Sequence, residues 1–270
     1  MKGAVRPPGR PCLQLRNVCK HFHTRQGKLH VLEGVNLHVR NGEFLCLLGP
    51  SGCGKSTLLH IMAGLELPDS GEVMIEGSPV TGPGPDRAVV FQDGALFPWL
   101  TVRDNVGFGL DLQPLTAAQR QERVDEALEL VRLGRFAGSC IHELSVGMRQ
   151  RVALARALAL RPKVLLMDEP FAAMDAQTRN VMQEELQGIW HRTGHAIVLV
   201  THNAAEAVRL GDRIAVLSFR PGKVRREVAI PYPRPRLADD PHVLEIRTFL
   251  LREMKADVHA AVEEELGDAN

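Results

Sequence analysis

The stretch GPSGCGKST, from Gly49 to Thr57, has the residue types and the spacing of a phosphate-binding loop. Glycines let backbone N–H groups curl around phosphate oxygens, and the helix expected after the loop adds a favourable dipole. Lys55 would neutralise the β and γ phosphates of a nucleotide, and the Ser56 hydroxyl would bind Mg²⁺. The alternative is a glycine-rich turn without a ligand. The predicted nucleotide contacts are Gly49, Pro50, Ser51, Gly52, Cys53, Gly54, Lys55, Ser56 and Thr57.

Polar side chains also follow two later apolar runs. In KVLLMDEP the apolar run is followed by Asp168 and Glu169, and AIVLVT is followed by His202. Open α/β sheets bind ligands at the carboxyl ends of their strands, so Asp168 is expected to hold Mg²⁺ through water and Glu169 to polarise the attacking water. A ring nitrogen of His202 could contact the γ phosphate or that water. The alternatives are a helix-capping role for the carboxylates and a structural role for the histidine.

The elements that must position these residues follow from the alternation of short apolar runs with helical patterns. This alternation predicts an α/β fold with a mainly parallel core sheet whose strands are buried on both faces. Residues 93–160 lack a strand pattern and are predicted to be an inserted helical part, in which Thr116 and Gln119 form a capping box. Strands are expected at Glu43–Leu48, Arg87–Phe91, Lys163–Asp168, Ala196–Thr201 and Arg213–Ser218.

The last part of the chain is predicted to contain a hairpin and a helix. FRPGKVRREVAI carries turn residues at Pro221 and Gly222 between two strand-like runs. After it, apolar residues recur at helical spacing up to an acidic end, which predicts a helix with a loose tail. The residues expected on one face of this helix are Val243, Ile246, Phe249 and Leu250.

Composition narrows the class of protein. With 270 residues, of which 44% are hydrophobic, the chain can bury a sizeable core. The 33 Lys and Arg residues nearly balance the 32 Asp and Glu residues, so no nucleic-acid partner is expected. Five scattered cysteines without a CxxC pair indicate reduced thiols in a cytosol. No apolar run approaches the ~18 residues that cross a bilayer, so if the protein works at a membrane, another chain would have to span it.

ELSVGMRQRVALARAL, with Ser145 at the start of a helical segment, resembles the signature loop of ATP-binding cassette (ABC) ATPases. The resemblance spans residues 13–235, with Gln92 as the Q-loop residue, a catalytic group and Mg²⁺ ligand, and Asp175 as the D-loop residue. Phe22 stands where the family places an aromatic that stacks on adenine. The resemblance implies a P-loop NTPase fold with an N-terminal antiparallel β subdomain. Its expected parts are a RecA-like core with the β subdomain (1–92 and 161–235), an α-helical signature subdomain (93–160), and a C-terminal helix and tail (236–270).

The family also implies partners. Two ATPase subunits would pair as a homodimer or as a mixed pair. ATP would lie between the phosphate loop of one subunit and the residues Ser145 and Gly147 of the other. Ser145 and Gly147 stand at the N-terminus of a predicted helix, which suits an anion. GEFLCLLGPSGCGKSTLLHIMAGLE and GPGPDRAVVFQDGALFPWLTVRDNV are most similar to importers of nitrate, sulfonate, taurine and similar anions. This implies a peripheral ATPase on the cytoplasmic side of the inner membrane, a permease bound through Phe97–Leu100, and a separate periplasmic solute-binding protein.

Two positions carry further expectations. Val146 replaces a usual glycine. A positive φ or a close approach to the partner's nucleotide there would cause strain and slow turnover, whereas an ordinary helical φ would tolerate the valine. Cys53 lies beside Lys55 near a helix N-terminus, which predicts a lowered thiol pKa and inactivation by maleimides. The alternatives to an importer ATPase are a soluble ABC ATPase outside transport and a nucleotide-gated regulatory module with impaired turnover.

Overall fold

The computed structural model describes residues 11–25, 27–237 and 239–267. The chain divides into two compact units, one formed by residues 1–83 with 196–270 and the other by residues 84–195. The three-part division expected from the sequence has different residue boundaries and stays a prediction. In the part of the chain that the structure describes, no helix is both long enough and apolar enough to cross a membrane.

The first unit begins with an antiparallel sheet of order β2-β1-β4-β5. Leu13, Leu15 and Val18 of β1 are buried, and shifts in the β1–β2 register break the strict alternation of buried and exposed positions. The antiparallel N-terminal sheet implied by the family resemblance is therefore confirmed. Its strands are β1 (Pro11–Thr24), β2 (Gly27–Arg40), β4 (Ser70–Ile75) and β5 (Ser78–Pro79).

A second set of strands in the same unit has the order β10-β9-β3-β8. Strands β9, β3 and β8 run parallel, and β10 pairs with β9 in the predicted hairpin. Every residue of β3, β8 and β9 is buried, which explains their continuous apolar sequences. The elements are β3 (Phe44–Leu48), α1 (Lys55–Ala63), β8 (Ala196–Thr201), α6 (Ala204–Leu210), β9 (Arg213–Leu217) and β10 (Val224–Ala229).

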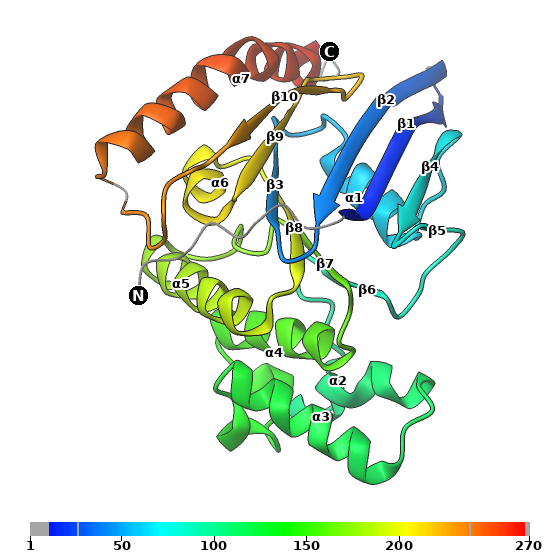
Figure 1. The fold of residues 1–270 in the computed structure, drawn as a ribbon, viewed down its shortest axis with the longest axis vertical. Coiled ribbons are helices and arrows are strands. Elements are labelled where there is room, and N and C mark those ends of the chain that lie inside the picture. Colours follow the sequence, from blue (N-terminus) through cyan, green and yellow to red (C-terminus); the bar gives the residue numbers. More distant parts are fainter. Residues whose placement is uncertain (1–10, 26, 238, 268–270) are drawn as a thin grey trace. The chain divides into compact units, whose positions relative to one another are not determined.

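The predicted C-terminal helix is present as α7 (Pro241–Gly267), which lies beside α6 (Figure 1). Val243 and Leu250 are buried as expected, Ile246 and Phe249 are half-buried, and Met254 and Ala261 continue the buried face. Because the buried positions recur every four or seven residues, one stripe of the helix faces the unit while the opposite face stays in solvent.

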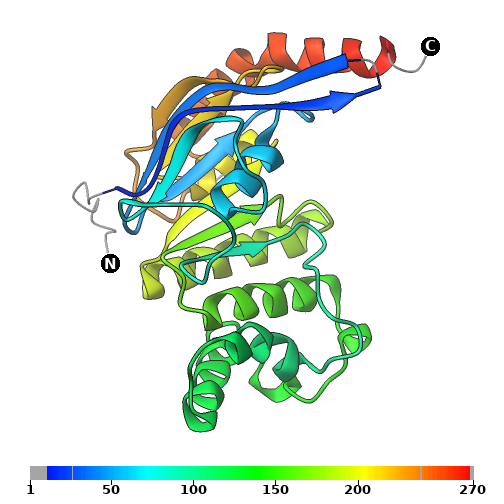
Figure 2. The same cartoon turned by 90° about the vertical axis from the view of Figure 1, so that its right-hand side faces the viewer.

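The second unit contains the two parallel strands β6 (Arg87–Val90) and β7 (Val164–Asp168) and a group of helices. Helices α2, α3 and α4 pack against one another and form the green group in Figure 2. The capping box is confirmed, since the Thr116 hydroxyl accepts the Gln119 N–H and the Gln119 side chain accepts the Thr116 N–H. The helices are α2 (Val102–Gly107), α3 (Ala117–Leu130), α4 (Val146–Ala159) and α5 (Ala176–Thr193), with short 3₁₀ turns at Phe108–Leu112, Gly134–Phe136 and Ile141–Glu143.

Candidate nucleotide-binding site

The phosphate loop connects β3 to α1 in the first unit. Gly54 precedes α1 with φ 95°, a conformation that glycine adopts without strain, and a Cβ atom there would come within 2.9 Å of the Val31 and Leu32 side chains. The buried Lys55 ammonium donates to the carbonyl oxygens of Gly49 (3.0 Å) and Pro50 (2.6 Å), which closes the loop. The first N–H groups of α1 lack partners within the helix, so this end of α1 can bind an anion.

His202 lies at the neighbouring strand end. β3 and β8 are parallel, with Leu48 opposite Thr201, so the phosphate loop and His202 begin at the same level of the sheet. Asn203, which directly follows His202, caps α6 by accepting the N–H groups of Ala205 (2.9 Å) and Glu206 (3.4 Å). The structure thus brings the predicted loop and the predicted histidine together.

Phe22 belongs to β1 of the same unit. Its side chain is 37% exposed, and the Lys20 ammonium lies 5.1 Å from the centre of its ring. An exposed ring face backed by a cation is a suitable platform for a purine base, because stacking needs only an accessible π-surface. Its contact with adenine stays a prediction.

Gln92, Asp168 and Glu169 lie at two paired strand ends in the second unit. β6 and β7 are parallel with Val90 opposite Met167, so all three residues follow the same edge. Gln92 is exposed, and the two carboxylates are half-buried. Glu169 has φ 42°, a left-handed conformation that is uncommon outside glycine and is typical of functional positions.

Ser145, Val146 and Gly147 form the first turn of α4. The Ser145 hydroxyl accepts the Met148 N–H (3.3 Å) as the helix cap. Val146 is the first helical residue, its φ is not positive, and its side chain is 43% exposed. The hypothesis of strain at Val146 is therefore wrong, because a β-branched residue adopts helical φ without a steric clash there.

Asp175 caps α5 beside this turn. Its carboxylate accepts the backbone N–H (2.9 Å) and the hydroxyl (2.8 Å) of Thr178, and these hydrogen bonds lower the pKa of Asp175. A Cβ at Gly147 would come within 3.2 Å of the Thr178 methyl group, so the starts of α4 and α5 are neighbours. The structure shows a capping role for Asp175, and its nucleotide contact stays a prediction.

Comparison with known proteins decides the family. The family model described as ABC transporter matches residues 32–172. This chain belongs to the ABC transporter ATP-binding family. The nitrate import ATP-binding protein NrtD of Synechocystis sp. is 48% identical over 221 residues, which cover 82% of this chain and 83% of NrtD. The taurine import ATP-binding protein TauB of Ruegeria pomeroyi is 46% identical over 221 residues, which cover 82% of each chain.

A solved structure agrees with the fold of this ABC ATPase. The dimeric ATP-binding cassette MJ0796, in a post-hydrolysis state bound to ADP and Pi, has a TM-score of 0.71 and 35% identity. The match covers 81% of this chain and 98% of that one. The predicted family and α/β fold class are both confirmed.

Cys53 departs from its expected chemistry. Its side chain is 0% exposed, and burial raises the pKa of the thiol although the Lys55 ammonium lies 3.9 Å from Sγ. The prediction of a lowered thiol pKa is wrong, because the loss of hydration penalises the thiolate more than Lys55 stabilises it. The buried Cys53 side chain instead fills space within the loop.

The predicted permease contact carries an exposed aromatic cluster. Trp99 is 76% exposed, and the Phe97 ring centre lies 5.6 Å from that of Trp99 and 4.3 Å from that of Phe108. Phe108 itself is 46% exposed, so the apolar surface extends beyond the stretch Phe97–Leu100 that the sequence suggested. A contiguous exposed group of aromatic side chains is typical of an interaction site.

Two residues that the sequence did not single out hold this cluster in place. Asn105 is fully buried, and its side chain accepts the Phe97 N–H (2.9 Å) and donates to the Phe97 carbonyl (3.0 Å). Arg156 of α4 donates to the carbonyl oxygens of Gly94 and Ala95, both at 2.7 Å, and its guanidinium lies 5.6 Å from the Phe97 ring centre. The partners of Arg156 are 61 and 62 positions away in sequence, whereas those of Asn105 lie within eight residues of it.

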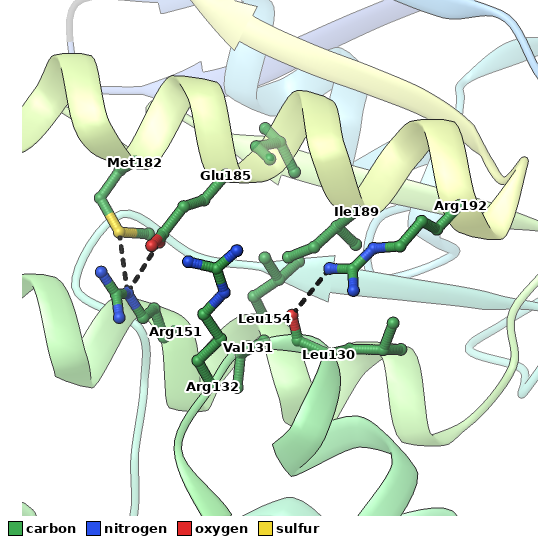
Figure 3. Close-up of a pocket in the computed structure, with 10 residues that line it drawn as sticks. Leu130, Val131, Arg132, Arg151, Leu154, Met182, Glu185, Ile189 and Arg192 are labelled. Atoms are coloured by element: carbon green, nitrogen blue, oxygen red, sulfur yellow. Dashed lines mark hydrogen bonds and ion pairs between the residues drawn. The ribbon is translucent and has the colours of Figure 1, made fainter.

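A small cavity of about 30 Å³ lies among α3, α4 and α5 (Figure 3). It has room for little more than water, so it is not a nucleotide site. Arg151 pairs with Glu185 (2.8 Å) and contacts the Met182 sulfur (3.5 Å), while Arg192 donates to the Leu130 carbonyl (3.1 Å). These contacts tie α5 to α4 and to the end of α3.

Proposed function

We propose that this chain hydrolyses Mg²⁺-ATP to power an ABC importer of a small anion such as nitrate, sulfonate or taurine. The pairing of β3 with β8, which places the phosphate loop beside His202, carries this proposal. The names of the relatives supply the solute class, since NrtD is a nitrate importer subunit and TauB a taurine importer subunit. The exposed aromatic cluster at Phe97–Leu100 supports a protein partner on the same chain.

The residues present suit Mg²⁺. The ion prefers oxygen ligands and is commonly held by one or two carboxylates together with substrate phosphates. Ser56 and Gln92 offer exposed oxygens, and Asp168 offers a carboxylate. Within the described residues, no group of three or more His, Cys, Asp or Glu could hold a metal alone, which agrees with an ion that arrives on the nucleotide. When bound, Mg²⁺ would offset the negative charge of the phosphates.

The roles of the other residues follow from their chemistry. Lys55 and the α1 N-terminus hold the phosphates by charge and by backbone N–H groups. Glu169 orients and polarises the water that attacks the γ phosphate in line, and the His202 ring contacts that phosphate or the water. Ser145 and Gly147 complete the site of a second ATPase subunit, because a helix N-terminus suits a phosphate and the Ser145 hydroxyl, which accepts the Met148 N–H, keeps its own hydrogen as a donor.

The proposed assembly has three kinds of partner. A second ATPase subunit, identical or related, pairs with this chain, as cassettes do in the MJ0796 dimer. An integral membrane permease contacts the cluster around Trp99, and a periplasmic solute-binding protein delivers the anion. The ATPase would then lie at the cytoplasmic face of the inner membrane. ATP binding closes the pair and hydrolysis reopens it, which the permease converts into alternating access.

The test measures uptake and ATP turnover in the same cells and membranes. We expect cells with wild-type chain to take up labelled nitrate, sulfonate or taurine, and cells with Glu169→Gln to take up none. The wild-type chain should copurify with a hydrophobic permease, and Trp99→Ala should weaken that association without lowering ATP binding. A different result would support a soluble ATPase outside transport. In that case uptake would persist with Glu169→Gln, and the chain would turn over ATP without any membrane partner.

The regulatory module with impaired turnover is not proposed. One ground for that alternative was strained backbone at Val146, and the structure shows an ordinary helical residue there.

A further inference from the structure

The connection between β9 and β10, residues 218–223, lies directly on the phosphate loop. A Cβ at Gly222 would come within 2.3 Å of the Cys53 carbonyl oxygen, so only glycine allows this approach. The Gly222 N–H donates to Val31 O (2.8 Å), and its carbonyl accepts the Glu33 N–H (3.1 Å). The connection is therefore fixed to β2 on one side and pressed against the loop backbone on the other.

Arg220 of this connection contacts the phosphate loop and α7 at once. Its Nε donates to the Gly52 carbonyl oxygen at 2.8 Å, and its Nη1 lies 2.7 Å from Oε1 of Glu264. The two side chains are 30% and 37% exposed, so the pair is partly shielded from solvent. Arg220 thus links a backbone oxygen of the nucleotide loop to a carboxylate near the end of the C-terminal helix.

Helix α7 also holds the rest of the connection. Asp257, which is only 7% exposed, accepts the Phe219 N–H (3.0 Å) and pairs with Arg225 (2.7 Å). One turn earlier, Glu253 pairs with Arg226 (3.0 Å), a contact that touches α7 and β10 but is not made to the phosphate loop. The position of Arg220 therefore depends on α7 in two ways. Its side chain pairs with Glu264, and the backbone N–H of the preceding residue, Phe219, is held by Asp257.

We propose that Arg220 positions the phosphate loop for nucleotide binding and that α7 controls this through Glu264. In a trans peptide the carbonyl oxygen and the following N–H point in opposite directions. Gly52 has φ 73° and no side chain to restrain it, so its peptide plane is free to turn unless its oxygen is held. By holding that oxygen, Arg220 fixes the direction of the Cys53 N–H, one of the groups that cradle phosphate in such loops.

This inference rests on the nucleotide site proposed above, and its test separates the two. We would measure the Kd of a fluorescent ATP analogue for the full chain and four variants, together with KM, kcat and the melting temperature. Arg220→Ala should weaken binding by about fivefold, which corresponds to about 1 kcal/mol. Glu264→Ala should weaken it by about twofold, and Arg220→Lys should lie between the wild type and Arg220→Ala. Arg226→Ala is the matched control, since it removes an α7 ion pair without touching the loop.

The expected pattern is a raised Kd and KM with kcat kept at saturating ATP, because Glu169 and His202 are untouched. The proposal is overturned if Arg220→Ala and Arg226→Ala bind the analogue equally well. It is also overturned if, in both of these variants, the rise in Kd simply follows the fall in melting temperature. If the wild-type chain itself neither binds nor hydrolyses ATP, the nucleotide site fails as a whole.

Discussion

Replacing Asn105 by alanine is expected to loosen the segment that presents Phe97 and Trp99. The Asn105 side chain is 0% exposed. Its Oδ1 accepts the Phe97 N–H at 2.9 Å, and its Nδ2 lies 3.0, 3.2 and 3.0 Å from the carbonyl oxygens of Phe97, Leu100 and Thr101. Alanine removes all of these partners at a site that is closed to solvent.

The magnitude follows from the groups left behind. The amide has two N–H donors, so at most two carbonyl oxygens and the Phe97 N–H lose a full hydrogen bond. The carbonyl oxygens of Phe97 and Thr101 keep the backbone N–H groups of Leu100 and Asn105 as partners, so the loss is that of individual hydrogen bonds, each of which contributes about 0.5–1.5 kcal/mol. With about 1 kcal/mol for each of the three groups, we expect Asn105→Ala to lower the free energy of unfolding by about 3 kcal/mol.

Urea denaturation measures that loss, and hydrogen exchange of the peptide that contains Phe97 measures its local part. Arg103→Ala is the matched control on the same helix, because its ion pair with Asp125 (2.8 Å) is exposed and should contribute at most about 1 kcal/mol. If Asn105→Ala loses no more stability than the control, and the Phe97 amide exchanges at the wild-type rate, the argument that Asn105 holds this segment is refuted.

Three further outcomes are expected. Glu169→Gln should keep ATP binding, stop turnover and trap the closed pair, as judged by nucleotide retention and gel filtration; normal hydrolysis would exclude its role on the water. N-ethylmaleimide at pH 7 should label the exposed Cys140 and spare Cys53, because a raised pKa keeps the buried Cys53 neutral. Peptide mapping should show that labelling of Cys53 increases only as the pH rises above the ordinary thiol pKa. In that range the contribution of the neutral thiol to the free energy of unfolding is also lost. Rapid labelling of Cys53 at pH 7 would contradict its burial. Val146→Gly should leave steady-state ATPase unchanged, and a clear rise would contradict the unstrained helical backbone.

The sequence by itself was sufficient for features that depend on near neighbours. The phosphate loop requires a strand, a glycine-rich turn and a helix in immediate succession, and each has a local signature. The capping box at Thr116 is set by residues within one turn, and the fully apolar runs before Asp168 and His202 indicate strands buried on both faces. These interactions act over a few residues, so residue types and spacing were enough to predict them.

Only the tertiary structure decided the features that depend on burial or on distant partners. The Cys53 thiol lies beside Lys55 in sequence, yet its pKa is raised because the loop is enclosed by other elements, which the local sequence does not show. Arg156 acquires its role from the packing of α4 against the segment that contains Gly94 and Ala95. Arg220 reaches Gly52 across 168 positions of sequence, and Arg213 reaches Glu43 across 170. The physical reason is that desolvation and hydrogen bonding depend on every group that surrounds an atom in space, and chain folding brings those groups together from distant parts of the sequence.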